Sequence, residues 1–179
     1  MADYEELKQM ALDSGFSHVG DLDVDTIELK QEVRDMCSAD KCHAYAKNWS
    51  CPPACGTIEE CAKKVHKYKR GILLQTTGEV DTMDIDDIME LAADHKEHYD
   101  TFQKKVRKQY PDAMIIRDGA CTKCKTCTYP DAPCRFPNEL FHPMEGLGML
   151  VSEVCQRNNL PYYYGPHPPG DSHHGPLPG

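Results

Sequence analysis

The sequence predicts a mixed α/β or α+β fold, in which helices flank a small mixed sheet and two cysteine-rich loops extend from it. Segments with helical periodicity alternate with short apolar runs along the 179 residues, an order typical of layered domains. The length is sufficient for one domain with a hydrophobic core. We expect that single domain to span residues 1–165 and a tail to span residues 166–179.

The first third of the chain is expected to hold a helix, a strand and a long loop. Asp3 and Glu6 form a capping-box pair before an apolar stripe, which predicts a helix over residues 3–15. Residues 16–24 have the character of a short strand. Residues 34–56 contain cysteines and prolines without periodicity, which indicates a loop.

The middle of the chain is expected to hold two helices with a strand between them. Thr57 and Glu60 form a second capping-box signature, and the helix that it opens should run to about residue 69. The short apolar run over residues 71–77 predicts a buried strand. Apolar residues recur every three or four positions from 84 to 108, which predicts a long amphipathic helix.

The last third is expected to add two strands and a helix before the tail. Residues 113–119 and 161–165 read as strands, and residues 143–158 read as a helix. The tail over residues 166–179 contains five prolines, three glycines and three histidines. It cannot bury a core, and we expect it to be disordered or extended.

The charge and the apolar pattern exclude several classes of protein. The net charge of −9 argues against sequence-independent binding to nucleic acid, which needs a cationic face. The N-terminal residues lack the basic and apolar regions of a signal peptide, and no apolar run approaches the length of a membrane span. We therefore expect a cytoplasmic protein, whose thiols stay reduced. In that compartment the ten cysteines indicate metal ligands rather than disulfides.

The second cysteine group has the spacing of a cluster-binding loop. Cys121, Cys124 and Cys127 stand three residues apart, which is the run used by bacterial ferredoxins for [4Fe–4S] clusters. Zinc sites instead use two well-separated C-x2-C pairs. Cys134 follows Cys127 with six residues between them, so whether it closes the same cluster stays open. The spacing favours an iron–sulfur cluster, with Zn²⁺ as the alternative.

The first cysteine group matches no simple zinc ribbon. Cys37, Cys42 and Cys51 are the ligands that we expect, and Pro52–Pro53 should hold the backbone extended beside Cys51. Cys55 is preferred as the fourth ligand. Cys61 lies within the helix expected from Thr57, where a small, half-buried residue is the simpler interpretation.

Three residues outside the expected ligand set have side chains that could bind metal or form hydrogen bonds. Cys155 shares a helix face with apolar residues and is expected to be a buried structural thiol. His95 lies on the apolar face of the long predicted helix, where a hydrogen-bonded core histidine is expected rather than a ligand. Arg135, beside Cys134, could donate to cluster sulfur or stand as a plain surface residue.

The stretch "MCSADKCHAYAKNWSCPPACGTIEEC", together with "CTKCKTCTYPDAPCRFP" and the following "PMEGLGMLV", resembles the DUF2284 family of predicted metal-binding proteins. The resemblance covers about residues 1–165. The family pattern falls on Cys37, Cys42 and Cys51 in the first motif, and on the four cysteines of the second motif with Arg135. It implies metal binding, in the form of iron–sulfur clusters, and assigns no reaction.

Three functional classes remain open. The first is an electron-transfer protein that carries two [4Fe–4S] clusters and serves a redox partner protein. The second is a zinc-binding structural or regulatory module. The third is an enzyme that uses a cluster on a small substrate, although the sequence offers no acid/base constellation away from the cysteines. We expect the first class, a carrier rather than a catalyst.

Overall fold

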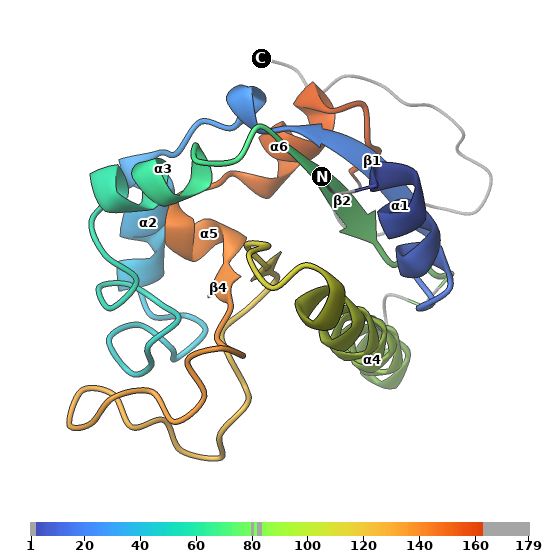
Figure 1. Ribbon diagram of the computed structural model, residues 1–179. Helices are drawn as coiled ribbons and strands as arrows, with labels where there is room; N and C mark the ends of the chain where they lie inside the picture. The colour runs from blue at the N-terminus through green and yellow to red at the C-terminus, as the bar shows by residue number, and fades with distance from the viewer. Residues whose placement is uncertain (1–2, 80, 82–83, 163–179) are drawn as a thin grey trace.

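The computed structural model describes residues 3–79, 81 and 84–162 (Figure 1). Its helices are α1 (Tyr4–Leu12), α2 (Gln31–Ser38), α3 (Ile58–Val65), α4 (Ile85–Gln109), α5 (Met144–Leu147) and α6 (Val151–Arg157), with a 3₁₀ turn η1 at Val24–Thr26. Its strands are β1 (His18–Asp23), β2 (Arg70–Gln75), β3 (Ile116–Arg117) and β4 (His142–Pro143). Helices and strands are both present in the described part of the chain, so the predicted mixed α/β class is confirmed.

The strands form two small sheets. Strands β1 and β2 pair antiparallel, with His18 opposite Gln75 and Asp23 opposite Arg70. The short strands β3 and β4 pair in parallel, with Ile116 opposite His142. The sheet content is therefore mixed, as expected, but it is divided between two separate pairs.

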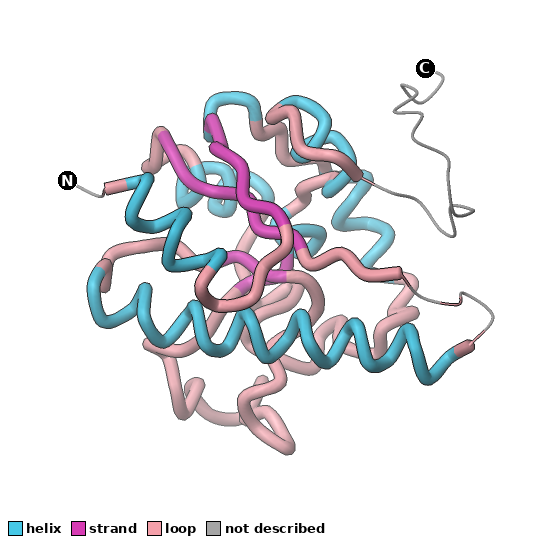
Figure 2. The backbone as a smooth tube through the Cα atoms, turned by 90° about the vertical axis from the view of Figure 1, so that its right-hand side faces the viewer, coloured by secondary structure: helices cyan, strands magenta, loops and turns pink. Residues whose placement is uncertain are grey.

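The β1–β2 sheet lies between two apolar cores. On β2, Leu73 packs into the core that α6 covers, whereas Ile72 and Leu74 face the core beneath α1 and α4. This alternation follows from the two-residue period of a strand. Figure 2 shows α4 running past the sheet on the same side as α1. Phe16 is at the centre of that second core and makes edge contacts with Tyr99 and Phe102 of α4.

The capping signatures mark helix starts correctly. The Asp3 side chain accepts from the backbone N–H groups of Glu5 and Glu6 at the start of α1. At α3 the reciprocal capping box between Thr57 and Glu60 is complete. These helix starts follow from local sequence because the interacting groups lie within one turn of each other.

One predicted boundary is wrong in the cysteine-rich part of the chain. The predicted loop over residues 34–56 begins with α2, whose Val33 and Arg34 are buried. No side chain caps α2 at Lys30. Instead, the Lys30 backbone N–H donates to the Gly148 carbonyl (2.8 Å). Tertiary contacts therefore stabilise this helix where its own sequence gives little signal.

The single helix predicted over residues 143–158 is also wrong. Gly148 has φ +98° and divides it into α5 and α6. A Cβ at this position would lie 2.6 Å from Ile58 Cδ1 and 3.0 Å from the Lys30 carbonyl oxygen. Only glycine fits such a close approach with a left-handed backbone.

Other predicted elements are shorter than expected. The helix that begins after Thr57 ends at Val65, and the strand expected over residues 113–119 is reduced to β3. Of the strand expected over 161–165, Pro161 and Tyr162 are not in a strand, and the rest lies outside the described residues. The tail expected over 166–179 also lies outside them.

Candidate metal centre

The two cysteine loops lie side by side at one end of the molecule. In Figure 1 the loop after α2 and the long loop between β3 and β4 extend together from the helical part. Trp49 of the first loop donates its indole N–H to the Ala132 carbonyl of the second (3.1 Å) and meets Tyr129 edge-on at 5.0 Å. The two sequence-distant cysteine groups therefore belong to one region of the fold.

The second group surrounds a common pocket. Its four cysteines are half-buried and line one cavity together with Asn48, Trp49, Lys123, Phe136 and Leu140. The surrounding loop has no regular structure and is held by its own hydrogen bonds. Arg135 donates to the Thr126 carbonyl (2.9 Å), and Thr128 Oγ1 donates to the Pro133 carbonyl (2.9 Å). Arg135 thus has a role in holding the loop.

The electrostatics of this group confirm that its thiols are neighbours. Burial raises the pKa of Cys121, and the nearby thiols of Cys134, Cys124 and Cys127 raise it further. A hydrogen bond from the backbone N–H of Lys123 acts in the opposite direction. Burial and the neighbouring thiols thus disfavour ionisation of Cys121, which is the situation that a bound cation relieves.

The first group comes together in a similar way. Cys37 lies in the last turn of α2, Cys42 is exposed and Cys51 is buried. Burial raises the pKa of Cys37, and the adjacent thiols of Cys42 and Cys51 add to the increase. The structure therefore brings together the three cysteines that the sequence singled out.

The loop that holds these three thiols has an unusual backbone. Asp40, His43 and Ala46 all have positive φ values, between 50° and 56°. Asp40 supports the loop by accepting from the Tyr45 backbone N–H (3.0 Å) and by pairing with Lys47 (2.6 Å). Backbone conformations of this kind persist only where surrounding structure holds them, and they cluster at functional sites.

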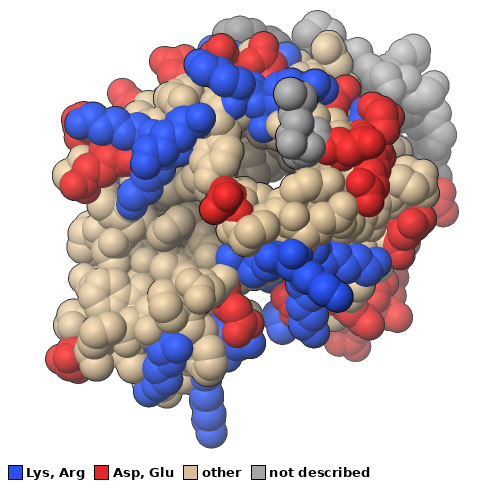
Figure 3. Space-filling model, in the orientation of Figure 1, with Lys and Arg blue, Asp and Glu red and all other residues tan. Residues whose placement is uncertain are grey.

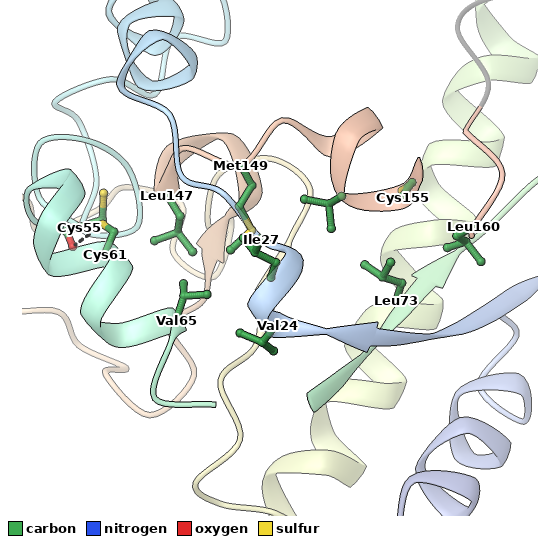
Figure 4. Close-up of a cluster of buried hydrophobic side chains, with 11 residues drawn as sticks. Val24, Ile27, Cys55, Cys61, Val65, Leu73, Leu147, Met149, Cys155 and Leu160 are labelled. Atoms are coloured by element: carbon green, nitrogen blue, oxygen red, sulfur yellow. Dashed lines mark hydrogen bonds between the residues drawn. The ribbon is translucent and has the colours of Figure 1, made fainter. Parts of the chain in front are cut away.

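Cys55 and Cys61 lie deeper, in the core (Figure 4). They are 2% and 0% exposed, and Cys61 Sγ donates to the Cys55 carbonyl (3.7 Å). A hydrogen bond between the two side chains raises the pKa of Cys55 and lowers that of Cys61. Cys51 also raises the pKa of Cys55, which places Cys55 next to the first group. Cys61 is more deeply buried than the half-buried residue expected from the sequence.

A hydrogen-bonded junction joins the two groups. Asn48 Oδ1 accepts from the Ser50 N–H (3.0 Å), the Ser50 hydroxyl (2.6 Å) and the Cys51 N–H (3.1 Å). Ser50 Oγ in turn accepts from the Cys121 N–H (3.0 Å), and its carbonyl contacts His142 Nδ1 (2.9 Å). Ser50 is 0% exposed. The backbones at Cys51 and Cys121 are thus held through one buried serine.

Sequence reasoning missed this junction because Asn48 and Ser50 look like ordinary loop residues. It also missed Arg34, although that residue lies three positions before Cys37 on what proves to be a helix. Residues at this spacing share a helix face, so a correct prediction of α2 would have brought Arg34 to attention.

The cysteines in the described ranges do not form a ready-made site for a single ion. Within residues 3–79, 81 and 84–162, no three His, Cys, Asp or Glu side chains are arranged to hold one metal ion. The four cysteines of the second group instead line the walls of their pocket.

Residues expected to be structural are satisfied without a metal. Cys155 is 4% exposed in the core beside α6, as expected of a structural thiol. His95 Nδ1 lies 2.8 Å from Thr76 Oγ1, and its Nε2 lies 3.3 Å from Asp118 Oδ1. The three tail histidines lie outside the described residues.

The surface over the cysteine loops differs from the rest of this face. In Figure 3 the lower left part, over the loops, carries few charged groups, whereas Lys, Arg, Asp and Glu gather over the helices. Of the aromatic residues in the second loop, Phe136 is 40% exposed and Tyr129 is partly buried.

Comparison with known proteins identifies one family. A family model described as "Predicted metal-binding protein (DUF2284)" matches residues 20–173, which include both cysteine groups. No curated protein and no solved structure matches the chain. None of the helices in the described part is both long and apolar enough to cross a membrane.

Proposed function

The chain belongs to the DUF2284 family of predicted metal-binding proteins, and we propose that it binds two [4Fe–4S] clusters and passes single electrons to a partner protein. The proposed ligands are Cys121, Cys124, Cys127 and Cys134 for one cluster, and Cys37, Cys42, Cys51 and Cys55 for the other. When bound, each cluster would supply a one-electron redox centre.

The observation that carries the cluster assignment is the pocket of the second group. All four thiols of this group line one cavity. A zinc ion needs its four donors around one point at about 2.0–2.3 Å. A cubane accepts donors at separated corners, and the spacing of Cys121, Cys124 and Cys127 is the one that such clusters use.

The remaining residues of the pocket are suited to shielding such a group. Trp49, Phe136 and Leu140 supply apolar surface around the four thiols. Trp49 is fixed by its hydrogen bond to the Ala132 carbonyl across the two loops. A low-polarity wall keeps water from the cluster and is one of the features by which proteins set reduction potentials.

Electron transfer is supported by the proximity of the two groups. The Ser50–Cys121 hydrogen bond joins a neighbour of one ligand directly to a ligand of the other group. A chain of this length has a radius of gyration of about 16 Å, so clusters on adjacent loops fall within exchange distance of each other. The loops also lie at one end of the molecule, where a partner can approach (Figure 1).

The partner is proposed to dock partly through complementary charge. The net charge of −9 favours a partner that presents a basic face, and salt should then slow the electron transfer. The weakly charged surface over the loops offers a contact region where the clusters come nearest to the partner.

The decisive experiment is metal analysis and redox titration of anaerobically purified protein. We expect brown protein with iron and acid-labile sulfide in near-equal amounts, approaching two cubanes per chain. Titration followed by EPR should give reversible one-electron reduction at low potential. Colourless protein with stoichiometric zinc would overturn the cluster assignment. Clusters that stay silent across the accessible potential range would exclude a carrier.

A further inference from the structure

Arg34 is a buried cation that pairs with no carboxylate among the residues the structure describes. Its side chain is 8% exposed on α2. In the described part of the chain its hydrogen-bond partner is Cys55 Sγ, 3.8 Å from Nη2, and its Nε has none. None of the ion pairs found among those residues includes Arg34. Arginine is almost never buried unless it is paired, since an uncompensated buried charge is costly.

The fold treats its other deeply buried arginine differently. Arg117 is 6% exposed, pairs with Asp100 at 2.7 Å, and lies over the rings of Tyr99 and Phe141. The Nε of Arg117 lacks a partner, as that of Arg34 does, but its Nη1 is compensated by the carboxylate of Asp100. At Arg34 that carboxylate is replaced by sulfur.

The surroundings of Arg34 are thiols of the first cysteine group. Cys37 lies three residues on along the same helix, and Cys55 accepts the guanidinium hydrogen bond. Lys64 adds a second cation by donating to the Cys55 carbonyl (2.9 Å). Hydrogen bonds to its own backbone and to Thr57 lower the pKa of the exposed Glu59, and the charge of Arg34 lowers it further. Among the described residues, Glu59 forms no ion pair with Arg34. The cation is thus directed at sulfur atoms, which become anionic when they bind metal.

We propose that Arg34 is the counter-cation of the first metal site and that it raises the reduction potential of the group bound there. This inference rests on the proposed function for the nature of that group. A cluster bound by four thiolates is negatively charged, and reduction makes it more so. A guanidinium that donates to a ligand sulfur therefore stabilises the reduced form more than the oxidised form. At the second site Lys123 and Arg135 are exposed, and no buried cation lies there among the described residues, so this site should not depend on Arg34.

The test compares four variants of the anaerobically purified, cluster-loaded protein. Arg34→Gln removes the charge, and Arg34→Lys keeps it with a different shape. Arg34→Met fills the buried space without a charge or unpaired donors, and it replaces the glutamine variant if that one does not fold. Arg157→Gln is the control, because it removes the same unit of charge from a half-exposed side chain on α6.

The expected result is a shift confined to one cluster. Arg34→Gln or Arg34→Met should lower the midpoint potential of the first cluster by about 59 mV or more, a tenfold change in a one-electron equilibrium, or should lose that cluster's iron while the second stays bound. Arg34→Lys should lie closer to wild type, and Arg157→Gln should match it. Equal potentials and iron contents in all variants would overturn the inference, as would equal shifts in Arg34→Lys and Arg34→Gln, because these would indicate a packing role.

The two proposals can fail separately. Wild-type protein with intact clusters and an Arg34→Gln variant of unchanged potential would refute only the counter-cation. Wild-type protein that holds zinc would refute the clusters. A competition assay for zinc would then decide the role of Arg34. A tenfold or greater loss of zinc affinity in Arg34→Gln, with near wild-type affinity in Arg34→Lys, would support the counter-cation. Equal zinc affinity in all variants would refute it.

Discussion

Replacing Ser50 by alanine should loosen the junction between the two cysteine loops. The change removes one buried oxygen and introduces no clash, so its effect comes from hydrogen bonds. The Cys121 N–H loses its acceptor, and Asn48 Oδ1 keeps two of its three donors. An unsatisfied donor costs about 1–3 kcal/mol and a lost neutral hydrogen bond about 0.5–1.5 kcal/mol. Cys121 is only half-buried, so water can replace part of the loss, and we expect about 2 kcal/mol.

Amide hydrogen exchange of the metal-loaded protein, followed by mass spectrometry, measures this loss locally. A local cost of about 2 kcal/mol corresponds to roughly thirtyfold faster exchange in the peptide that contains Cys121. Ser14→Ala is the matched control, because Ser14 is also buried and also makes two side-chain hydrogen bonds, to Met10 and Lys105, but in the core beneath α1 and α4. Exchange at Cys121 within twofold of wild type in Ser50→Ala would refute the assignment of Ser50 as the link.

Three further predictions concern ligands, capping and pH. Cys124→Ser should remove the iron of one cluster, whereas Cys155→Ser should retain all the iron and lower the free energy of unfolding by about 1 kcal/mol. Iron analysis and thermal melting test both variants. Iron loss in the Cys155 variant alone would contradict the division into ligands and core. Thr57→Ala breaks the capping box with Glu60 and should lower the free energy of unfolding by about 1 kcal/mol. Urea denaturation measures this change, and an unchanged denaturation midpoint would contradict the prediction. Burial lowers the pKa of His142 below its ordinary 6.5, so its contribution to stability is complete above that value and is lost as the pH falls through the folded-state pKa. His142→Gln should therefore flatten the fall in melting temperature below pH 6.5, and a slope equal to wild type would assign that fall to another group.

Features that depend on neighbours in the sequence could be predicted well. The caps at Asp3 and at Thr57 with Glu60 are correct because the donor and acceptor lie within one helical turn. The long helix predicted over residues 84–108 matches α4 because its apolar period extends over many turns. The spacing of Cys121, Cys124 and Cys127 is likewise a local property of the chain, and it predicts these residues as ligands.

Features that depend on distant contacts could not be predicted in this way. Helix α2 lacks a side-chain cap and is fixed at its start by the carbonyl of Gly148, more than a hundred residues later. Gly148 in turn breaks the expected C-terminal helix because Ile58 and Lys30 leave no room for a Cβ. In both places a long-range contact outweighs local helix propensity, which differs between residue types other than proline by only about 1 kcal/mol per residue.

The sequence by itself determined that this chain carries two cysteine groups with the chemistry of metal ligands. Only the tertiary structure decided that Ser50 joins those groups and that Arg34 is buried against Cys55, with no carboxylate paired to it in the described part of the chain. The physical reason is that ligand identity and spacing are written in the covalent chain, whereas burial and hydrogen-bond partners depend on which distant segments the fold brings together. The contribution of a buried charge or hydroxyl to stability depends on the groups packed around it, and only the fold fixes those groups.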